Sequence, residues 1–264
     1  MDDFALLKRF IENTLAIQCS NYKEDYIKRR LSSRMRSTNC SGYEDYLRYL
    51  KANPLELEKL RNALTINVTE FFRDYDVYDF IQNEILPVLF RQKKRLRIWS
   101  AGCSTGEEPY SLAMILSELV SHNPELSARI FATDIDEVVL AKAREGIYTP
   151  KAMVKLSEAQ ISNHFNRLPD GNFQVKPHLT ELIRFQPHDL MSPVPISRWI
   201  DLVICRNVTI YFNEKQKNEL AKTFHGALAS GGFYIMGKTE YLGRQMEILF
   251  TPYNSLQKIF IKKD

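Results

Sequence analysis

The sequence of 264 residues lacks the features that would place it in or across a membrane. No apolar run approaches the ~20 residues that a membrane-spanning helix requires. Residues Met1–Arg9 mix acids with apolar residues and do not have the basic head and apolar stretch of an export signal. We therefore expect a cytoplasmic protein with no direct membrane insertion.

Metal-binding and nucleic-acid-binding signals are also missing. The four cysteines, Cys19, Cys40, Cys103 and Cys205, lie far apart and show no paired ligand spacing, which predicts reduced thiols and no metal site. The net charge of +4 is too small to demand a nucleic-acid partner. We expect a monomer that binds no nucleic acid.

The first quarter of the chain has helical patterning. Apolar residues recur at helical spacing, as Phe4, Leu7 and Ile11 do, and Gly42 interrupts the pattern. The sequence therefore predicts an all-helical N-terminal domain and linker over residues 1–75.

Short apolar runs then alternate with helical patterns, which is typical of a largely parallel sheet covered on both faces. This predicts an α/β, Rossmann-like domain over residues 76–264. The expected strands are Leu96–Ala101, Arg129–Thr133, Leu182–Gln186, Ile200–Cys205 and Phe233–Met236, with helices that include Glu107–Val120, Glu137–Arg144 and Glu214–Leu228.

One segment interrupts the alternation. Asp170-Gly171 lies between Phe165–Leu168 and Phe173–Val175, and Asp-Gly favours a two-residue hairpin turn. We expect a small antiparallel β insertion at about residues 147–188.

A candidate cofactor site follows the first expected strand. Gly102 and Gly106 allow a ligand to approach the backbone, although such a turn is often purely structural. Asp134 lies 28 residues after Gly106, where a carboxylate can accept hydrogen bonds from a ribose; alternatively, it is the N-cap of the next helix. Glu107 and Glu108 would repel a pyrophosphate, so a cationic cofactor, S-adenosylmethionine, is favoured over NAD.

Three segments together resemble the chemotaxis receptor glutamate methyltransferases, the CheR family. They are Asn67–Arg73, Ala101–Ser111 and Cys205–Phe212. The resemblance extends over nearly the whole chain. It implies cofactor contacts from Asn67, Thr69, Arg73, Glu108, Asp134, Asp189, Leu190, Arg206 and Asn207. Asp189 stands where the family commonly has asparagine, and a carboxylate can still accept from an adenine amino group.

The resemblance also implies the reaction, methyl esterification of glutamates on the cytoplasmic domain of chemoreceptors, with S-adenosylhomocysteine as the product. A glutamate carboxylate is ionised at pH 7 and is itself the nucleophile, so no base is needed. Arg73 and Tyr211 are the expected catalytic residues that align it. The alternative is that Arg73 only bridges the domains and Tyr211 belongs to the core.

A cationic helix face is the expected receptor contact. Arg29, Arg30, Arg34 and Arg36 avoid the apolar stripe of their helix and favour docking of an acidic receptor helix, although such faces are usually only solvated. A second basic cluster, Arg91–Arg97, is interpreted as a solvated loop.

Two functions compete with the glutamate methyl esterification expected above. One is a non-catalytic S-adenosylmethionine-binding scaffold, which intact Arg73 and Tyr211 disfavour. The other is a nucleic-acid methyltransferase, but Arg206-Asn207-Val208 replaces the Asn/Asp-Pro-Pro-aromatic pattern, and no Pro-Cys pair occurs.

The hairpin tip, Leu168–Asn172, bears on whether the protein binds a C-terminal receptor pentapeptide. Relatives that bind a C-terminal receptor pentapeptide have a longer, glycine-richer tip, whereas proline and Asp-Gly make this one short and stiff. We expect independence from such a pentapeptide.

Overall fold

The computed structural model describes residues 2–15, 17–64 and 69–264. The chain divides into two compact units. The first comprises Met1–Asn67 and Tyr211–Gln216, and the second comprises Val68–Ile210 and Lys217–Asp264. A short segment from late in the sequence therefore completes the helical unit.

The first unit is helical, as predicted. It contains α1 (Asp3–Leu15), a 3₁₀ turn (Cys19–Asn21), α2 (Glu24–Ser37), α3 (Tyr43–Ala52) and α4 (Pro54–Leu64). Side chains at helical spacing, among them Leu7, Ile11, Ile27 and Leu31, are buried in one core. The late segment joins this unit through an isolated antiparallel bridge between Tyr22 and Phe212.

One arginine of the expected cationic face lies inside this unit. Arg34 donates two hydrogen bonds to Glu56, at 2.9 Å and 2.7 Å, and Tyr46 Oη donates to the same carboxylate at 2.8 Å. Glu56 is only 4% exposed, so this network ties α2 to α3 and α4. The Arg34 guanidinium therefore neutralises a buried carboxylate while its side chain stays partly exposed, and its contact with the receptor stays a prediction.

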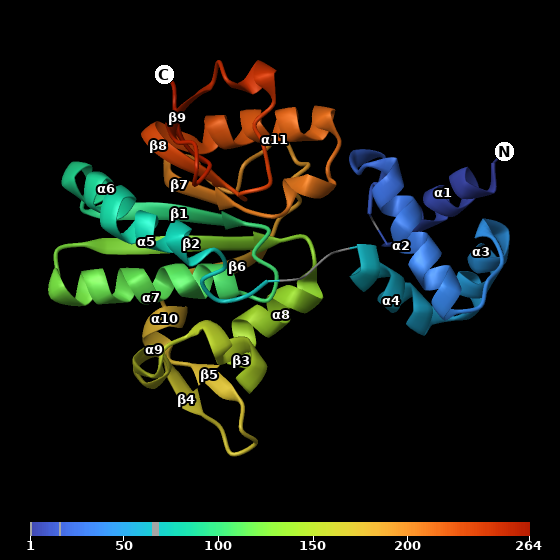
Figure 1. Ribbon diagram of the computed structural model, residues 1–264, viewed down its shortest axis with the longest axis horizontal. Helices are drawn as coiled ribbons and strands as arrows, with labels where there is room; N and C mark the ends of the chain where they lie inside the picture. Colours follow the sequence, from blue (N-terminus) through green and yellow to red (C-terminus); the bar gives the residue numbers. More distant parts are fainter. Residues whose placement is uncertain (1, 16, 65–68) are drawn as a thin grey trace. The chain divides into compact units, whose positions relative to one another are not determined.

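The second unit is built on a seven-stranded sheet in the order β6-β2-β1-β7-β8-β10-β9 (Figure 1). Strands β6 to β8 in this order pair in parallel, whereas β10 pairs antiparallel with both β8 and β9. The bounds are β1 Arg95–Ala101, β2 Ser127–Asp134, β6 Ile183–Pro187, β7 Ile200–Cys205, β8 Leu228–Met236, β9 Phe250–Asn254 and β10 Ile259–Lys262. The five expected strands are present, and the antiparallel pair β9–β10 is additional.

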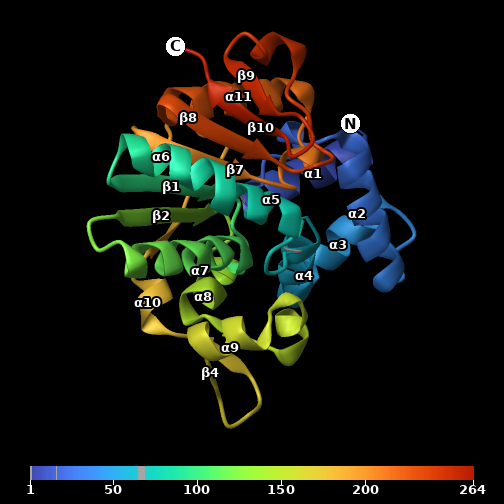
Figure 2. The ribbon, with the colours of Figure 1, turned by 60° about the vertical axis from the view of Figure 1, so that its left-hand side comes forward.

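Helices cover the sheet, and one of them, α7, also packs against the insertion. Helix α7 runs along the sheet beside β2, and the insertion lies on the far side of α7 (Figures 1 and 2). The helices are α5 Tyr75–Phe80, a π-helical turn Ile81–Ile85, α6 Leu86–Gln92, α7 Glu107–His122, α8 Glu137–Glu145, α9 Glu158–His164, α10 Pro177–Thr180 and α11 Glu214–Ala227, with 3₁₀ turns at Pro150–Lys155, Thr209–Tyr211 and Arg244–Met246. None of the described helices is both long enough and apolar enough to cross a bilayer.

The insertion is a three-stranded antiparallel sheet in the order β3-β5-β4, as expected. Its strands are β3 Ile147–Tyr148, β4 Phe165–Arg167 and β5 Phe173–Val175. The hairpin tip differs from the expected two-residue turn. Leu168 N donates to Asn172 O, and Gly171 N donates to Leu168 O, so the loop contains Pro169-Asp170-Gly171 with Gly171 at φ +86°. The pairing of β4 with β5 leaves three residues in the loop instead of two. Three-residue hairpin loops of this kind commonly end in a left-handed residue, here Gly171.

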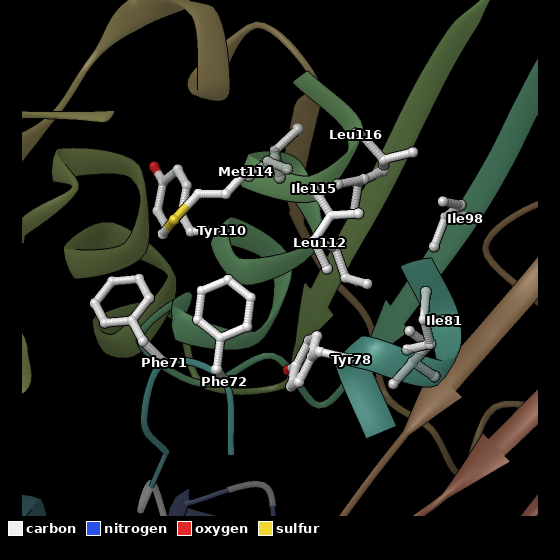
Figure 3. Packing of buried hydrophobic residues seen from close by; sticks show 14 of the residues in the cluster. Phe71, Phe72, Tyr78, Ile81, Ile98, Tyr110, Leu112, Met114, Ile115 and Leu116 are labelled. Atoms are coloured by element: carbon white, nitrogen blue, oxygen red, sulfur yellow. The ribbon is translucent and has the colours of Figure 1, made fainter. Parts of the chain in front are cut away.

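The core of the second unit lies around α7. Phe71 and Phe72 point toward Tyr110 and Met114 of α7, and Tyr78 of α5 lies beside them (Figure 3). The aromatic pair thereby fixes the segment that enters this unit from the helical unit.

Candidate cofactor and active site

The sheet order predicts a ligand site at the carboxyl ends of β1 and β7. Strand β1 has β2 and β6 on one side and β7 and β8 on the other, so the chain order reverses beside it. In open α/β sheets, ligands bind at the carboxyl ends of the strands at such a switch point.

The loop after β1 brings bare backbone to this edge. Gly102 has φ +82°, and a Cβ atom built on it would lie 2.6 Å from Val208 Cγ2; Gly106 has φ +98°. Only glycine tolerates both conditions. The amides of Gly102 and Cys103 donate to Thr133 O at 2.8 Å and 2.9 Å, which fixes the loop to the end of β2.

Asp134 also holds this loop. Its Oδ2 accepts from Ser104 N at 2.9 Å, and its Oδ1 accepts from Asp136 N at 3.0 Å. The N-cap of α8 is Asp136, which accepts from Val138 N, so the alternative that Asp134 caps this helix is wrong. Each carboxylate oxygen keeps further acceptor capacity, so Asp134 can still receive two ribose hydroxyls. Burial raises the pKa of Asp134 above its usual range.

The two acids that open α7 have different surroundings. Glu107 is 6% exposed and accepts from Thr105 Oγ1 at 2.7 Å, and burial raises its pKa. Glu108 is half-buried and accepts from Ser100 Oγ at 2.7 Å. Desolvation raises the pKa of Glu108 to about 7, partly offset by Arg206. Only Glu108 keeps access to a ligand, and a nearby cation would restore its charge.

The segment before α5 meets the end of β7. Arg206 Nη1 donates to Arg73 O at 2.8 Å, and Nη2 pairs with the Asp74 carboxylate. Phe72 and Asp74, on either side of Arg73, have φ values of +48° and +59°. Left-handed residues of this kind cost on the order of 1–3 kcal/mol each and cluster at functional sites.

The aromatic residues in this segment anchor it. Phe72 N donates to Ser111 Oγ at 2.9 Å, and Phe71 makes an edge contact with Tyr148, with ring centroids 4.8 Å apart. Thr69 is half-buried at the start of the described part, and Asn67 lies outside the described residues. The backbone of Arg73 is thus fixed relative to the carboxyl end of the sheet.

Three further expected contacts lie after β6 and β7. Asn207, at φ +61°, has a buried Oδ1. Leu190 is 8% exposed, whereas Asp189 is exposed and accepts from Met191 N at 2.8 Å in a local turn. Asp189 is therefore the most solvated of the residues assigned to the cofactor.

Sequence reasoning missed the residue that shapes the β7 end. Glu240 is 3% exposed and accepts from the backbone amides of Asn207 at 2.9 Å, Thr209 at 2.7 Å, Ile210 at 3.2 Å and Gly237 at 2.6 Å. Thr209 Oγ1 donates to it as well, at 2.7 Å. Its only sequence signal is an acid shortly after a buried strand, which is common in any loop.

The described residues fit a nucleoside with a cationic group. Three buried polar atoms at this edge, Ser104 Oγ, Arg206 Nε and Asn207 Oδ1, have no hydrogen-bond partner within the described ranges. Buried polar atoms are normally paired, so these atoms point to a polar ligand. Asp134 has acceptor capacity for a ribose, and Glu108 has a carboxylate that can pair with an ammonium or sulfonium; both contacts stay predictions.

Tyr211, the second expected catalytic residue, belongs to the helical unit. Its carbonyl accepts from Lys23 N at 3.0 Å, and its ring lies 4.8 Å from that of Tyr26 on α2. The guanidinium groups of Arg29 and Arg30 lie over the same Tyr26 ring, at 6.0 Å and 5.4 Å. Two arginines of the expected receptor-binding face and Tyr211 therefore share one aromatic neighbour.

A Rossmann-like sheet with acids at the ends of β1 and β2 is typical of S-adenosylmethionine-dependent methyltransferases. Family comparison gives the same class. Residues 67–259 match the model described as "CheR methyltransferase, SAM binding domain", and residues 2–65 match "CheR methyltransferase, all-alpha domain". The chain belongs to the CheR methyltransferase family.

Curated relatives cover most of the chain. A "Chemotaxis protein methyltransferase" of Borreliella burgdorferi is 37% identical over 90% of this chain and 88% of its own length. A protein of the same name from Listeria monocytogenes is 33% identical, over 91% and 90% respectively. "Chemotaxis protein methyltransferase 1" of Pseudomonas aeruginosa is 32% identical, over 91% and 90%.

The raised pKa of Glu108 predicts a pH-dependent cofactor affinity. At about 7 for the free protein, the carboxyl is mostly protonated at pH 6 and mostly ionised at pH 8. If the cationic cofactor binds the ionised form, its affinity should rise about tenfold between these pH values and level off above. Calorimetry should show this rise, and Glu108→Gln should abolish it. A parent affinity that is independent of pH would remove Glu108 from the site.

Loss of the Glu240 charge should affect stability and cofactor binding together. Glu240→Gln places an amide N–H₂ among backbone donors and leaves some of them unpaired, at about 1–3 kcal/mol for each buried group. We expect the free energy of unfolding to fall by roughly 2–4 kcal/mol and cofactor affinity to weaken as Asn207 shifts. Glu247→Gln, on an exposed position, is the matched control for denaturant unfolding. Equal stability of the two variants would contradict the assigned role.

Proposed function

We propose that this chain transfers a methyl group from S-adenosylmethionine to glutamate side chains of chemotaxis receptors, as a cytoplasmic monomer. The relatives' names support a chemotaxis substrate. The observation that carries the glutamate specificity lies in the helical unit. Arg29 and Arg36 are exposed on α2, and Arg29 and Arg30 contact Tyr26, which packs on Tyr211. An acidic helix docked on α2 would bring carboxylates toward Tyr211.

The chemistry requires alignment more than proton transfer. S-adenosylmethionine supplies an electrophilic methyl group on a cationic sulfur. An oxygen–carbon bond forms as the carbon–sulfur bond breaks, giving a methyl ester and S-adenosylhomocysteine, and no proton moves because the glutamate is already ionised. Binding both groups in line is worth several kcal/mol.

Arg73 and Tyr211 are the residues that we propose to hold the substrate carboxylate. The backbone of Arg73 is fixed by Arg206 and by two buried phenylalanines, which suits a residue that must aim a charge. Tyr211 is half-buried against Tyr26, and its phenol can donate without neutralising the nucleophile. Because Arg73 and Tyr211 share the contact with the substrate carboxylate, neither has to neutralise it, and the carboxylate stays reactive.

Turnover distinguishes this enzyme from a non-catalytic cofactor-binding scaffold. The protein should be incubated with methyl-labelled S-adenosylmethionine and membranes that contain the host receptors. We expect protein-bound label that mild base releases, because methyl esters are base-labile. Cofactor binding without any labelled product would favour the scaffold, and base-stable label on nucleic acid would favour a nucleic-acid methyltransferase.

The receptor-docking role of α2 can be tested in the same assay. Arg29→Glu with Arg36→Glu should lower receptor methylation about tenfold at low salt, with a smaller loss at high salt, while cofactor affinity is retained. Arg48→Glu with Lys51→Glu makes the same charge change on exposed positions of α3 and is the control. Equal loss in both pairs would mean that only net charge matters.

We also propose that the chain works without a receptor C-terminal pentapeptide. Its hairpin loop is closed by the Leu168–Asn172 pair, and Asp170 Oδ1 accepts from Asn172 N at 3.0 Å, so the tip is internally bonded. Opening it around an added strand would break these bonds. Titration with C-terminal receptor pentapeptides should show no saturable binding, and micromolar affinity would refute the proposal.

A further inference from the structure

An exposed tryptophan lies at the end of the sheet opposite the cofactor edge. Trp199 immediately precedes the first residue of β7, is 69% exposed and has φ +62°. A bulky residue in the left-handed region is an outlier that the surrounding structure must hold in place. Neither burial nor the proposed methyl transfer accounts for it.

Trp199 forms one wall of a hollow of about 450 Å³. The loop residues Pro193 and Pro195 and Gly226 of α11 also line it. No heavy atom lies within 4 Å of a Cβ atom built on Gly226, so the missing side chain contributes to the open space. The hollow has the size to receive one or two side chains of a partner, and its lining combines apolar and charged residues.

The rim of the hollow is positively charged. Arg198, Lys222 and Lys262 line it together with one acid, Glu219, which pairs with Lys222 at 2.8 Å. The Arg198 side chain is exposed. An anionic partner is therefore favoured over a cationic one.

The second basic cluster of the sequence, Arg91–Arg97, supports this loop. Lys93 Nζ lies 2.5 Å from Asp201 Oδ1, and Arg97 pairs with Ser197 of the loop. These two residues are therefore structural and not merely solvated, whereas Arg91 and Arg95 stay exposed and add positive charge at the same end of the sheet. The cluster thus both holds the loop in place and adds positive charge at this end of the sheet.

We propose that Trp199, the Arg198/Lys222/Lys262 rim and the hollow between them form a docking site for an acidic peptide segment of a protein partner. Trp199 would act as the central aromatic contact, and the rim would pair with carboxylates. The concave lining favours a peptide over an anionic membrane, because a flat bilayer surface would not fill a hollow.

A random dodecapeptide display library, panned on the full chain after depletion on the Trp199→Ala variant, tests this site. We expect enriched peptides with net negative charge and an apolar residue.

Bound peptide should protect Trp199 from acrylamide quenching, while Trp99, which is fully buried, gives the protected reference signal. By calorimetry, Trp199→Gly and Gly226→Glu should each weaken binding at least tenfold, and Lys222→Ala should weaken it more than Lys142→Ala on the exposed face of α8.

Stability separates a binding role from a structural one. Glycine relieves the left-handed strain, so Trp199→Gly should keep or raise the melting temperature and keep methyltransferase activity while losing the peptide. Enriched peptides without net negative charge, or peptides that bind both variants as well as the parent, would overturn the proposal. Binding of phosphatidylglycerol vesicles, lost in the same variants, would assign the face to a membrane and also overturn it.

Discussion

The carboxylate of Glu240 fixes the turn on which the cofactor edge depends. Four backbone amides and one hydroxyl converge on it, so the chain after β7 cannot adopt another path without leaving buried donors unpaired. This turn positions Arg206, which in turn holds the backbone of Arg73. The last amide in the set, that of Ile210, immediately precedes Tyr211, so one anion fixes the backbone from Asn207 to Ile210.

Local sequence patterns were sufficient for the architecture. Alternating strand and helix patterns gave the parallel part of the sheet, and helical spacing gave the N-terminal unit, because both depend on which side chains must be buried nearby. The antiparallel pair β9–β10 was missed, since its strands are short and partly exposed at the sheet edge. The hairpin was placed correctly, but its loop length depends on the register of β4 and β5.

Long-range pairing explains the remaining differences at the site. A helical wheel places Arg34 one turn after Arg30, but it cannot show that Glu56 approaches from another helix. In the same way, Asp134 and Asp136 are equivalent as sequence signals for a cap, and only the backbone distinguishes them. The described atoms show which expected residues share the sheet edge; the contact of each with the cofactor stays a prediction.

The helical unit is made of two separate chain segments, which limits how chimaeras of two homologues can be built. Because Tyr211–Gln216 belongs to that unit, the chain passes between units after Asn67, after Ile210 and after Gln216. Asn213 N donates to Asn21 O at 3.1 Å, and Gln216 Nε2 donates to Asn21 Oδ1 at 2.9 Å, so the late segment is bonded to the turn before α2. A gene fusion that exchanged only the N-terminal part between two homologues would split this interface between parents. The helical unit therefore cannot be exchanged as one contiguous segment; a chimaera that keeps its internal contacts must take two separate stretches from the same parent.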